Sequence, residues 1–89
     1  MIRQHAYYSG RVQGVGFRYT VARVAGNYPV NGYVRNMMDG QVEIVVEGEE
    51  SEVQVFLEDV AESMRAYIRN TKIQNEPLQG ETKGFDIRF

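Results

Sequence analysis

A glycine-rich segment followed closely by an arginine is the part of this chain best suited to chemistry. The segment runs Gly10-Arg11-Val12-Gln13-Gly14-Val15-Gly16, and Phe17-Arg18 comes directly after it. Its glycines let the backbone turn sharply, so that successive N–H groups can point inward together. A helix is predicted to begin here, and its first N–H groups carry the positive end of the helix dipole. The segment therefore predicts an anion site suited to phosphate, to which Arg18 adds a bidentate contact.

A simpler interpretation of the same segment stays open at this point. A tight strand-to-helix turn with a surface arginine would use the same residues. Two nucleotide-binding interpretations fail, however. No Gly-Lys-Ser/Thr follows, as a nucleotide-triphosphate loop requires, and the glycines do not have the dinucleotide spacing. No acidic residue follows within about 20 positions to bind a ribose.

A second candidate segment is Gly32-Tyr33-Val34-Arg35-Asn36. Asn36 ends a predicted strand beside a turn, and its side chain offers a neutral donor and acceptor. Such a group can hold a water molecule without titrating. The alternative is that Asn36 merely starts the hairpin turn, which is a common role of asparagine.

Composition limits the remaining possibilities. The 89 residues suffice for one domain, residues 1–89, and the 43% hydrophobic and 25% charged content is typical of a globular chain. No apolar run approaches a membrane span, and the N-terminus has no signal-peptide pattern, so we expect a cytoplasmic protein. With no cysteine and only one histidine, His5, the sequence offers no thiolate chemistry and no histidine-rich metal site.

Charge is distributed unevenly along the chain. Residues 1–38 contain five arginines and no acid, whereas residues 39–89 contain five bases and twelve acids, giving the net charge of −2. A general nucleic-acid binder would have a pI well above the value of 5.3 found here. The basic N-terminal part suggests one compact anionic ligand instead, although chance segregation of surface charges would look the same.

Two segments have helical spacing of apolar residues. In the first, the apolar stripe runs from Phe17 to Tyr28, and Pro29 is expected to end the helix. The second covers residues 50–65, where Ser51 and Gln54 could form a capping box. The acidic side chains on the second helix are expected to face solvent.

Five segments have strand character: residues 2–9, 32–36, 41–47, 67–74 and 85–89. Asp39-Gly40 is the hairpin signal between the second and third of them. In residues 41–47, apolar and polar side chains alternate, so Glu43 and Glu47 are expected on a solvent face. The order predicts an α+β fold, the ferredoxin-like βαββαβ sandwich, with an antiparallel sheet, two helices on one face and a short extra C-terminal strand.

Taken together, the two candidate segments resemble the two signatures of the acylphosphatase family. The first signature, Gly-x-Val-Gln-Gly-Val-x-Phe-Arg, is matched at every specified position by residues 10–18. The second is matched by residues 32–36 together with Gly40, Val42 and Gly48. The predicted elements are also those of this family, so the resemblance spans essentially the whole chain.

The resemblance implies hydrolysis of small-molecule acyl phosphates to a carboxylate and inorganic phosphate. The implied catalytic residues are Arg18 and Asn36, with Asn36 orienting the attacking water. The implied phosphate-binding residues are Arg11, Val12, Gln13, Gly14, Val15, Gly16 and Arg18. A carboxylate is a weak base that leaves without a proton donor, which agrees with a site that has no acidic side chain, metal or cofactor. Catalysis would rest on positioning and charge stabilisation.

Other functions and details stay open from the sequence. The same fold occurs as a carbamoyl phosphate-processing module of larger maturation proteins. It also resembles RNA-recognition domains, but Tyr7 and Tyr8 are adjacent and therefore point to opposite faces. Tyr19 and Tyr33, which flank Arg18 and Asn36 along the chain, could wall the site. We expect a monomer without nucleic-acid or membrane partners; the physiological acyl group cannot be read from the sequence.

Overall fold

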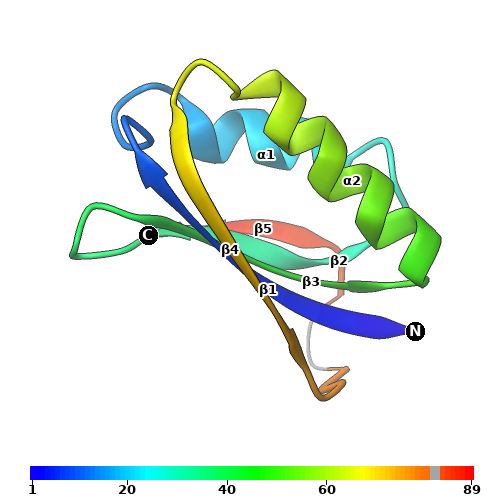
Figure 1. The fold of residues 1–89 in the computed structure, drawn as a ribbon. Helices are drawn as coiled ribbons and strands as arrows, with labels where there is room; N and C mark the ends of the chain where they lie inside the picture. Colours follow the sequence, from blue (N-terminus) through cyan, green and yellow to red (C-terminus); the bar gives the residue numbers. More distant parts are fainter. Residues whose placement is uncertain (81–82) are drawn as a thin grey trace.

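The computed structural model describes residues 1–80 and 83–89, which form a five-stranded sheet with two helices on one face (Figure 1). This is the predicted ferredoxin-like α+β arrangement with one added strand. Neither helix of the described residues is long and apolar enough to cross a membrane. The elements are β1 (Ile2–Gly10), α1 (Phe17–Ala25), β2 (Asn31–Asn36), β3 (Val42–Gly48), α2 (Glu50–Ser63), β4 (Ile68–Glu76) and β5 (Phe85–Arg88).

The sheet has the strand order β4-β1-β3-β2-β5, so β1 and β3 lie at its centre. The first four strands are antiparallel to their neighbours, as predicted, but β5 pairs with β2 in parallel. The predicted fold is confirmed, and the extra C-terminal strand, whose direction the sequence left open, makes the sheet mixed. The direction of β5 follows from the path of the chain. β4 runs opposite to β2 and ends at the edge of the sheet at which β2 begins. There Gly84 donates to the Asn31 side chain at 2.8 Å, and β5 then runs alongside β2.

Both helices differ at their ends from the sequence prediction. The first ends at Ala25 rather than at Tyr28, because Gly26 is its C-cap and a turn follows. The half-buried Tyr28 still packs against the core from that turn, and its hydroxyl donates to Asp59 at 2.8 Å. The predicted capping box is wrong, because Glu49 occupies the N-cap of α2 and makes no side-chain cap. The side chain of Gln54 donates to Glu50 at 3.3 Å instead.

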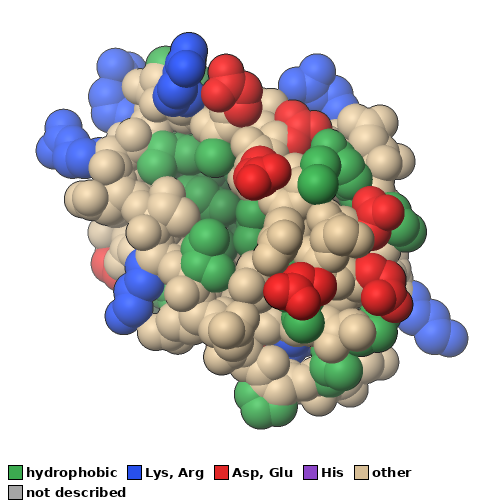
Figure 2. Space-filling model, turned by 45° about the vertical axis from the view of Figure 1, so that its right-hand side comes forward, with side chains coloured by type: hydrophobic (Ala, Val, Ile, Leu, Met, Phe, Trp, Pro, Cys, Tyr) green, Lys and Arg blue, Asp and Glu red, His purple; other side chains and the backbone are tan. Residues whose placement is uncertain are grey.

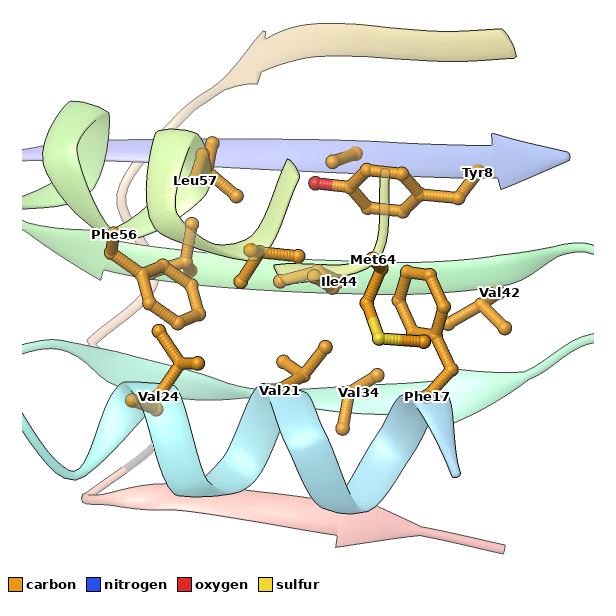
Figure 3. Packing of buried hydrophobic residues seen from close by; sticks show 14 of the residues in the cluster. Tyr8, Phe17, Val21, Val24, Val34, Val42, Ile44, Phe56, Leu57 and Met64 are labelled. Carbon is orange, nitrogen blue, oxygen red and sulfur yellow. The ribbon is translucent and has the colours of Figure 1, made fainter. Parts of the chain in front are cut away.

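One hydrophobic core fills the space between the helices and the sheet. Figure 3 shows Val21 and Phe17 of α1, Phe56 and Leu57 of α2, and Ile44 of β3 pointing toward one another. These side chains come from the predicted apolar stripes and from the helix-facing side of the strands. Burying each such side chain is worth about 1.5–3 kcal/mol. The core therefore fixes the start of α1 against the end of β2, which is where the candidate residues lie.

The opposite face of the sheet carries no helix, and here the sequence prediction fails. Glu43 and Glu47 were expected in solvent, but only 3% and 5% of their surfaces are exposed. Both lie on the central strand β3, and long cationic side chains from the neighbouring strands cover them. Arg3 on β1 contacts Glu47 at 2.6 Å, and Arg35 on β2 pairs with Glu43. Ion pairing makes burial of these carboxylates possible.

A histidine and a further glutamate complete this ion cluster. Nε2 of His5 lies 2.7 Å from Glu43, and Nδ1 lies 2.8 Å from Glu76. Glu76 also accepts from Arg3 at 3.1 Å. His5 itself is half-buried on β1. Both of its ring nitrogens can donate at once only when the imidazole is protonated.

This cluster should make folding stability depend on pH. Hydrogen bonds from His5 and then from Arg3 lower the pKa of Glu76 in the folded protein below the ordinary value of 4.5. A depressed carboxylate pKa stabilises the fold above the unfolded value, and the contribution is lost as pH falls through the folded value. We therefore expect the Tm of the wild type to fall from about pH 5 downwards.

Thermal unfolding of the Glu76→Gln variant, followed by circular dichroism, checks this expectation. The variant should unfold at a lower temperature than the wild type at pH 7. The two curves should converge as the wild-type carboxylate becomes protonated. A constant difference in Tm between pH 7 and pH 3 would contradict the assigned role of Glu76.

Candidate active site

The glycine-rich segment forms the connection between β1 and α1, as predicted. Gly14 and Gly16 have φ values of 79° and 76°, in the left-handed region that favours glycine. Gly16 is the N-cap of α1, and its carbonyl accepts the Thr20 N–H at 3.0 Å. The loop therefore leads directly into the positively polarised start of a helix.

A small cavity opens at this loop. It has a volume of about 170 Å³ and is bounded by the loop, the first turn of α1 and the end of β2. Arg18 and Asn36, which are well separated in the sequence, both line it. The other lining residues are Val12, Gly14, Gly16, Phe17 and Tyr19. Since Arg18 carries the only charge among these residues, the cavity is suited to an anion.

The carboxamide of Asn36 is the most informative group in the cavity. Its Oδ1 is buried and accepts no hydrogen bond from the described residues. A buried acceptor left without a partner costs about 1–3 kcal/mol, so a bound donor would be favoured there. Asp39, rather than Asn36, holds the turn that follows β2. Its carboxylate accepts the Gln41 N–H at 3.0 Å. This bond lowers the pKa of Asp39.

Gln13 holds the shape of the loop and is not among the residues that line the cavity. Nε2 of Gln13 donates to the carbonyl oxygens of Met37 and Gln41, at 2.8 and 2.9 Å. The loop is thereby tied to the turn between β2 and β3. The side chain of Val12 is fully buried in the core. The loop is thus anchored on both sides of its glycines.

The structure does not bring every predicted phosphate ligand into the cavity. The N–H of Arg11 donates to the Tyr67 carbonyl at 2.9 Å, and its side chain lines a separate depression with Arg69. Neither Gln13 nor Val15 lines the cavity, and Val15 packs against the core. The predicted ligands that do meet in the cavity are Val12, Gly14, Gly16 and Arg18.

Arg18 has contacts that the sequence did not predict. Its Nη1 donates to the Arg88 carbonyl oxygen at 3.5 Å, and its Cζ lies 4.6 Å from the ring centre of Phe89. An aromatic ring on the face of a guanidinium attracts it while leaving the edge free to donate. The chain that leaves β5 thus packs against Arg18. The alternating apolar residues at the C-terminus predicted a strand but not this neighbour.

A metal site and a larger hollow are the two alternatives to this cavity. No group of three histidine, cysteine or acidic side chains in the described part of the chain could hold a metal ion. A larger hollow of about 370 Å³ lies between α2 and β4, lined by Tyr8, Leu57 and Ile73 among others. Figure 2 shows such a hollow of hydrophobic side chains with acidic side chains beside it. Arg18 and Asn36 do not line this hollow, so the smaller cavity is the candidate site.

The loop geometry predicts a selective effect of a single methyl group. An added Cβ at Gly16 meets no atom within 4 Å, so Gly16→Ala should cost only the backbone strain of a left-handed residue. That strain is about 1–2 kcal/mol. A backbone that relaxes to relieve the strain should turn the loop N–H groups away from their common direction. We expect a several-fold weaker affinity for inorganic phosphate, measured by calorimetric titration.

Gly40 offers the matched control for this change. It also has positive φ and no atom within 4 Å of an added Cβ, but it lies in the turn after β2. Gly40→Ala should lose similar stability in a denaturant titration and keep the wild-type phosphate affinity. Equal loss of phosphate affinity in both variants would contradict a specific role of the loop.

Comparison with known proteins gives a consistent result. The family model described as acylphosphatase matches residues 4–87. An acylphosphatase of Moorella thermoacetica is 46% identical over 89 residues, which cover 99% of this chain and 95% of the relative. The crystal structure of acylphosphatase from Bacillus subtilis superimposes with a TM-score of 0.91 at 34% identity, and the match covers all of both chains. The HypF structure from T. kodakarensis matches at 36% identity and a TM-score of 0.85, covering all of this chain but only 12% of that one.

Proposed function

The chain belongs to the acylphosphatase family, which hydrolyses acyl phosphates, and on that basis we propose how its residues perform the reaction. The N–H groups at Gly14 to Gly16 and at the start of α1 bind the phosphoryl oxygens. Arg18 adds two hydrogen bonds and neutralises charge on the same oxygens. Preorganised donors of this kind lower the barrier by stabilising charge in the transition state.

Asn36 supplies the second half of the proposed mechanism. Its Oδ1 accepts a hydrogen bond from a water molecule and holds the water oxygen toward phosphorus. The P–O bond to the acyl group breaks as the new P–O bond forms, and the carboxylate leaves with the bonding electrons. A water proton passes to a phosphate oxygen, so the products are a carboxylate and dihydrogen phosphate. Positioning of this kind can supply much of a phosphoryl-transfer rate.

A single observation carries this proposal. Asn36, whose buried Oδ1 accepts no hydrogen bond from the described residues, lines the same small cavity as Arg18. A residue that can bind an anion and a residue that can bind a water molecule thus line the same cavity. No carboxylate among the described lining residues would repel the phosphate.

Hydrolysis of benzoyl phosphate, followed by the loss of its ultraviolet absorbance, tests the proposal. We expect rapid turnover in the presence of a metal chelator and competitive inhibition by inorganic phosphate. Folded protein without turnover, or turnover lost with the chelator, would contradict the proposed mechanism.

A second candidate function is the module role considered from the sequence. The match to HypF covers only 12% of that chain, so a domain of this kind also stands within a larger protein. A module that processes carbamoyl phosphate would hydrolyse this compound much faster than benzoyl phosphate. Measuring both rates on the same preparation separates the two functions.

We also propose that the enzyme acts as a monomer in the cytoplasm. The cavity with Arg18 and Asn36 is lined by residues of one chain, so the proposed mechanism needs no second copy. Sedimentation equilibrium with phosphate present should give the mass of one chain, 10.2 kDa. A dimer mass would exclude the monomer without affecting the proposed site.

A further inference from the structure

The size of the cavity limits how much of a substrate it can hold. Pockets that enclose a whole drug-sized ligand have volumes of about 300–1,000 Å³. The cavity here has about 170 Å³, and its anion-binding groups lie in the loop and in α1. The phosphoryl group therefore occupies the interior, and the substituent on the acyl carbon extends past the mouth. Whatever borders the mouth meets that substituent.

Of two exposed aromatic side chains in this region, one packs on Arg18 and the other lines the cavity. Tyr19 lines it, yet 62% of the surface of this residue is exposed. Phe89 is 84% exposed, and its ring lies 4.6 Å from the Arg18 ζ carbon. Single exposed apolar residues are common on protein surfaces, but Tyr19 directly follows Arg18 in the chain, and Phe89 packs on the Arg18 guanidinium. Neither ring is needed by the core, from which both are absent.

We infer that the enzyme selects acyl phosphates whose acyl group is aromatic or bulky and apolar, and that Tyr19 is the residue that selects them. The inference rests on the proposed function, because it assumes that the phosphoryl group enters the loop. An aryl ring on the carbonyl carbon then lies at the mouth, where it can pack on the exposed ring of Tyr19. An acetyl group ends at one methyl group and leaves most of that ring uncovered.

The charge around the cavity agrees with a neutral acyl group. Among its described lining residues, Arg18 is the only charged one, and the phosphoryl group uses it. Arg11, the other arginine of the loop, lines a different depression. A second anionic group on the substrate would thus find aromatic surface rather than a cation at the mouth.

The test compares kcat/KM for benzoyl phosphate and acetyl phosphate in the wild type and in Tyr19→Ala. Dividing one value by the other, and then comparing the two proteins, cancels the different chemical reactivity of the substrates. We expect the preference of the wild type for benzoyl phosphate to fall by roughly three- to tenfold in Tyr19→Ala, as for loss of one aromatic contact. Tyr19→Phe should retain it, because the ring remains.

Met38→Ala is the matched control. Met38 is fully exposed in the turn after β2 and does not line the cavity, so the substrate preference should not change. An unchanged preference in Tyr19→Ala, or an equal fall in Met38→Ala, would overturn the inference while turnover shows the proposed function intact. Absence of turnover with both substrates in the wild type would instead overturn the proposed function, and the inference with it.

Discussion

The Arg18→Gln variant is expected to lose phosphate binding and turnover together. Arg18 is the only charged side chain among the described residues that line the cavity, and glutamine has neither its charge nor its paired donors. Losing a single preorganised donor typically costs about 100- to 1,000-fold in kcat. Because a positive charge is lost as well, we expect kcat/KM for benzoyl phosphate to fall at least about 1,000-fold.

Arg23→Gln is the matched control for this change. Arg23 lies in the last turn of the same helix, is exposed, and does not line the cavity. Its variant should keep kcat/KM within about twofold of the wild type. Phosphate affinity, measured by calorimetric titration, should follow the same pattern in both variants. A fall in kcat with unchanged phosphate affinity in Arg18→Gln would contradict the assigned phosphate contact.

The Asn36→Ala variant should separate the two halves of the mechanism. The variant retains the loop amides and Arg18, so its inhibition constant for inorganic phosphate should remain close to that of the wild type. The water loses its acceptor, so kcat should fall by about 100- to 1,000-fold. Steady-state kinetics with phosphate as a competitive inhibitor measure both quantities in one set of experiments.

Asn70→Ala provides a control with the same chemical change. Asn70 is exposed on the edge strand β4 and does not line the cavity. Neither kcat nor the inhibition constant should change in that variant. If Asn36→Ala lost phosphate binding as severely as turnover, Asn36 would be a phosphate ligand, and its assigned role would be wrong.

The order of the elements and the two candidate segments could be predicted because their signals are local. Glycines before a helical stripe, an Asp-Gly turn and alternating strands depend only on neighbours along the chain. That Arg18 and Asn36 line the same cavity depends on the fold as a whole. The ferredoxin-like arrangement, inferred from element order, brings the start of α1 to the end of β2.

The sequence prediction of Glu43 failed because its partners lie far along the chain, whereas the end of α1 failed locally, at the Gly26 C-cap. Alternation in β3 placed Glu43 in solvent, but strand order brings Arg35 beside it, and His5 from the other neighbouring strand. The resemblance implied that Arg11 binds phosphate, which stays a prediction; in the structure its N–H donates to the Tyr67 carbonyl. The apolar stripe of α1 continued to Tyr28, but the backbone leaves the helix after Ala25.

Phe89 is the residue near the site that sequence patterns could least anticipate. It follows a short strand, and only the parallel pairing of β5 with β2 carries it to Arg18. The direction of an added edge strand depends on where the preceding strand ends. Apolar alternation alone contains no such information.

Hydrolysis of benzoyl phosphate in water enriched in ¹⁸O tests the central claim most directly. If Arg18 and the loop hold the phosphoryl group while Asn36 directs water at phosphorus, the label must enter inorganic phosphate. Mass spectrometry of both products should then find unlabelled benzoate. Label in the benzoate carboxylate would show attack at the carbonyl carbon and would contradict the arrangement proposed for this site.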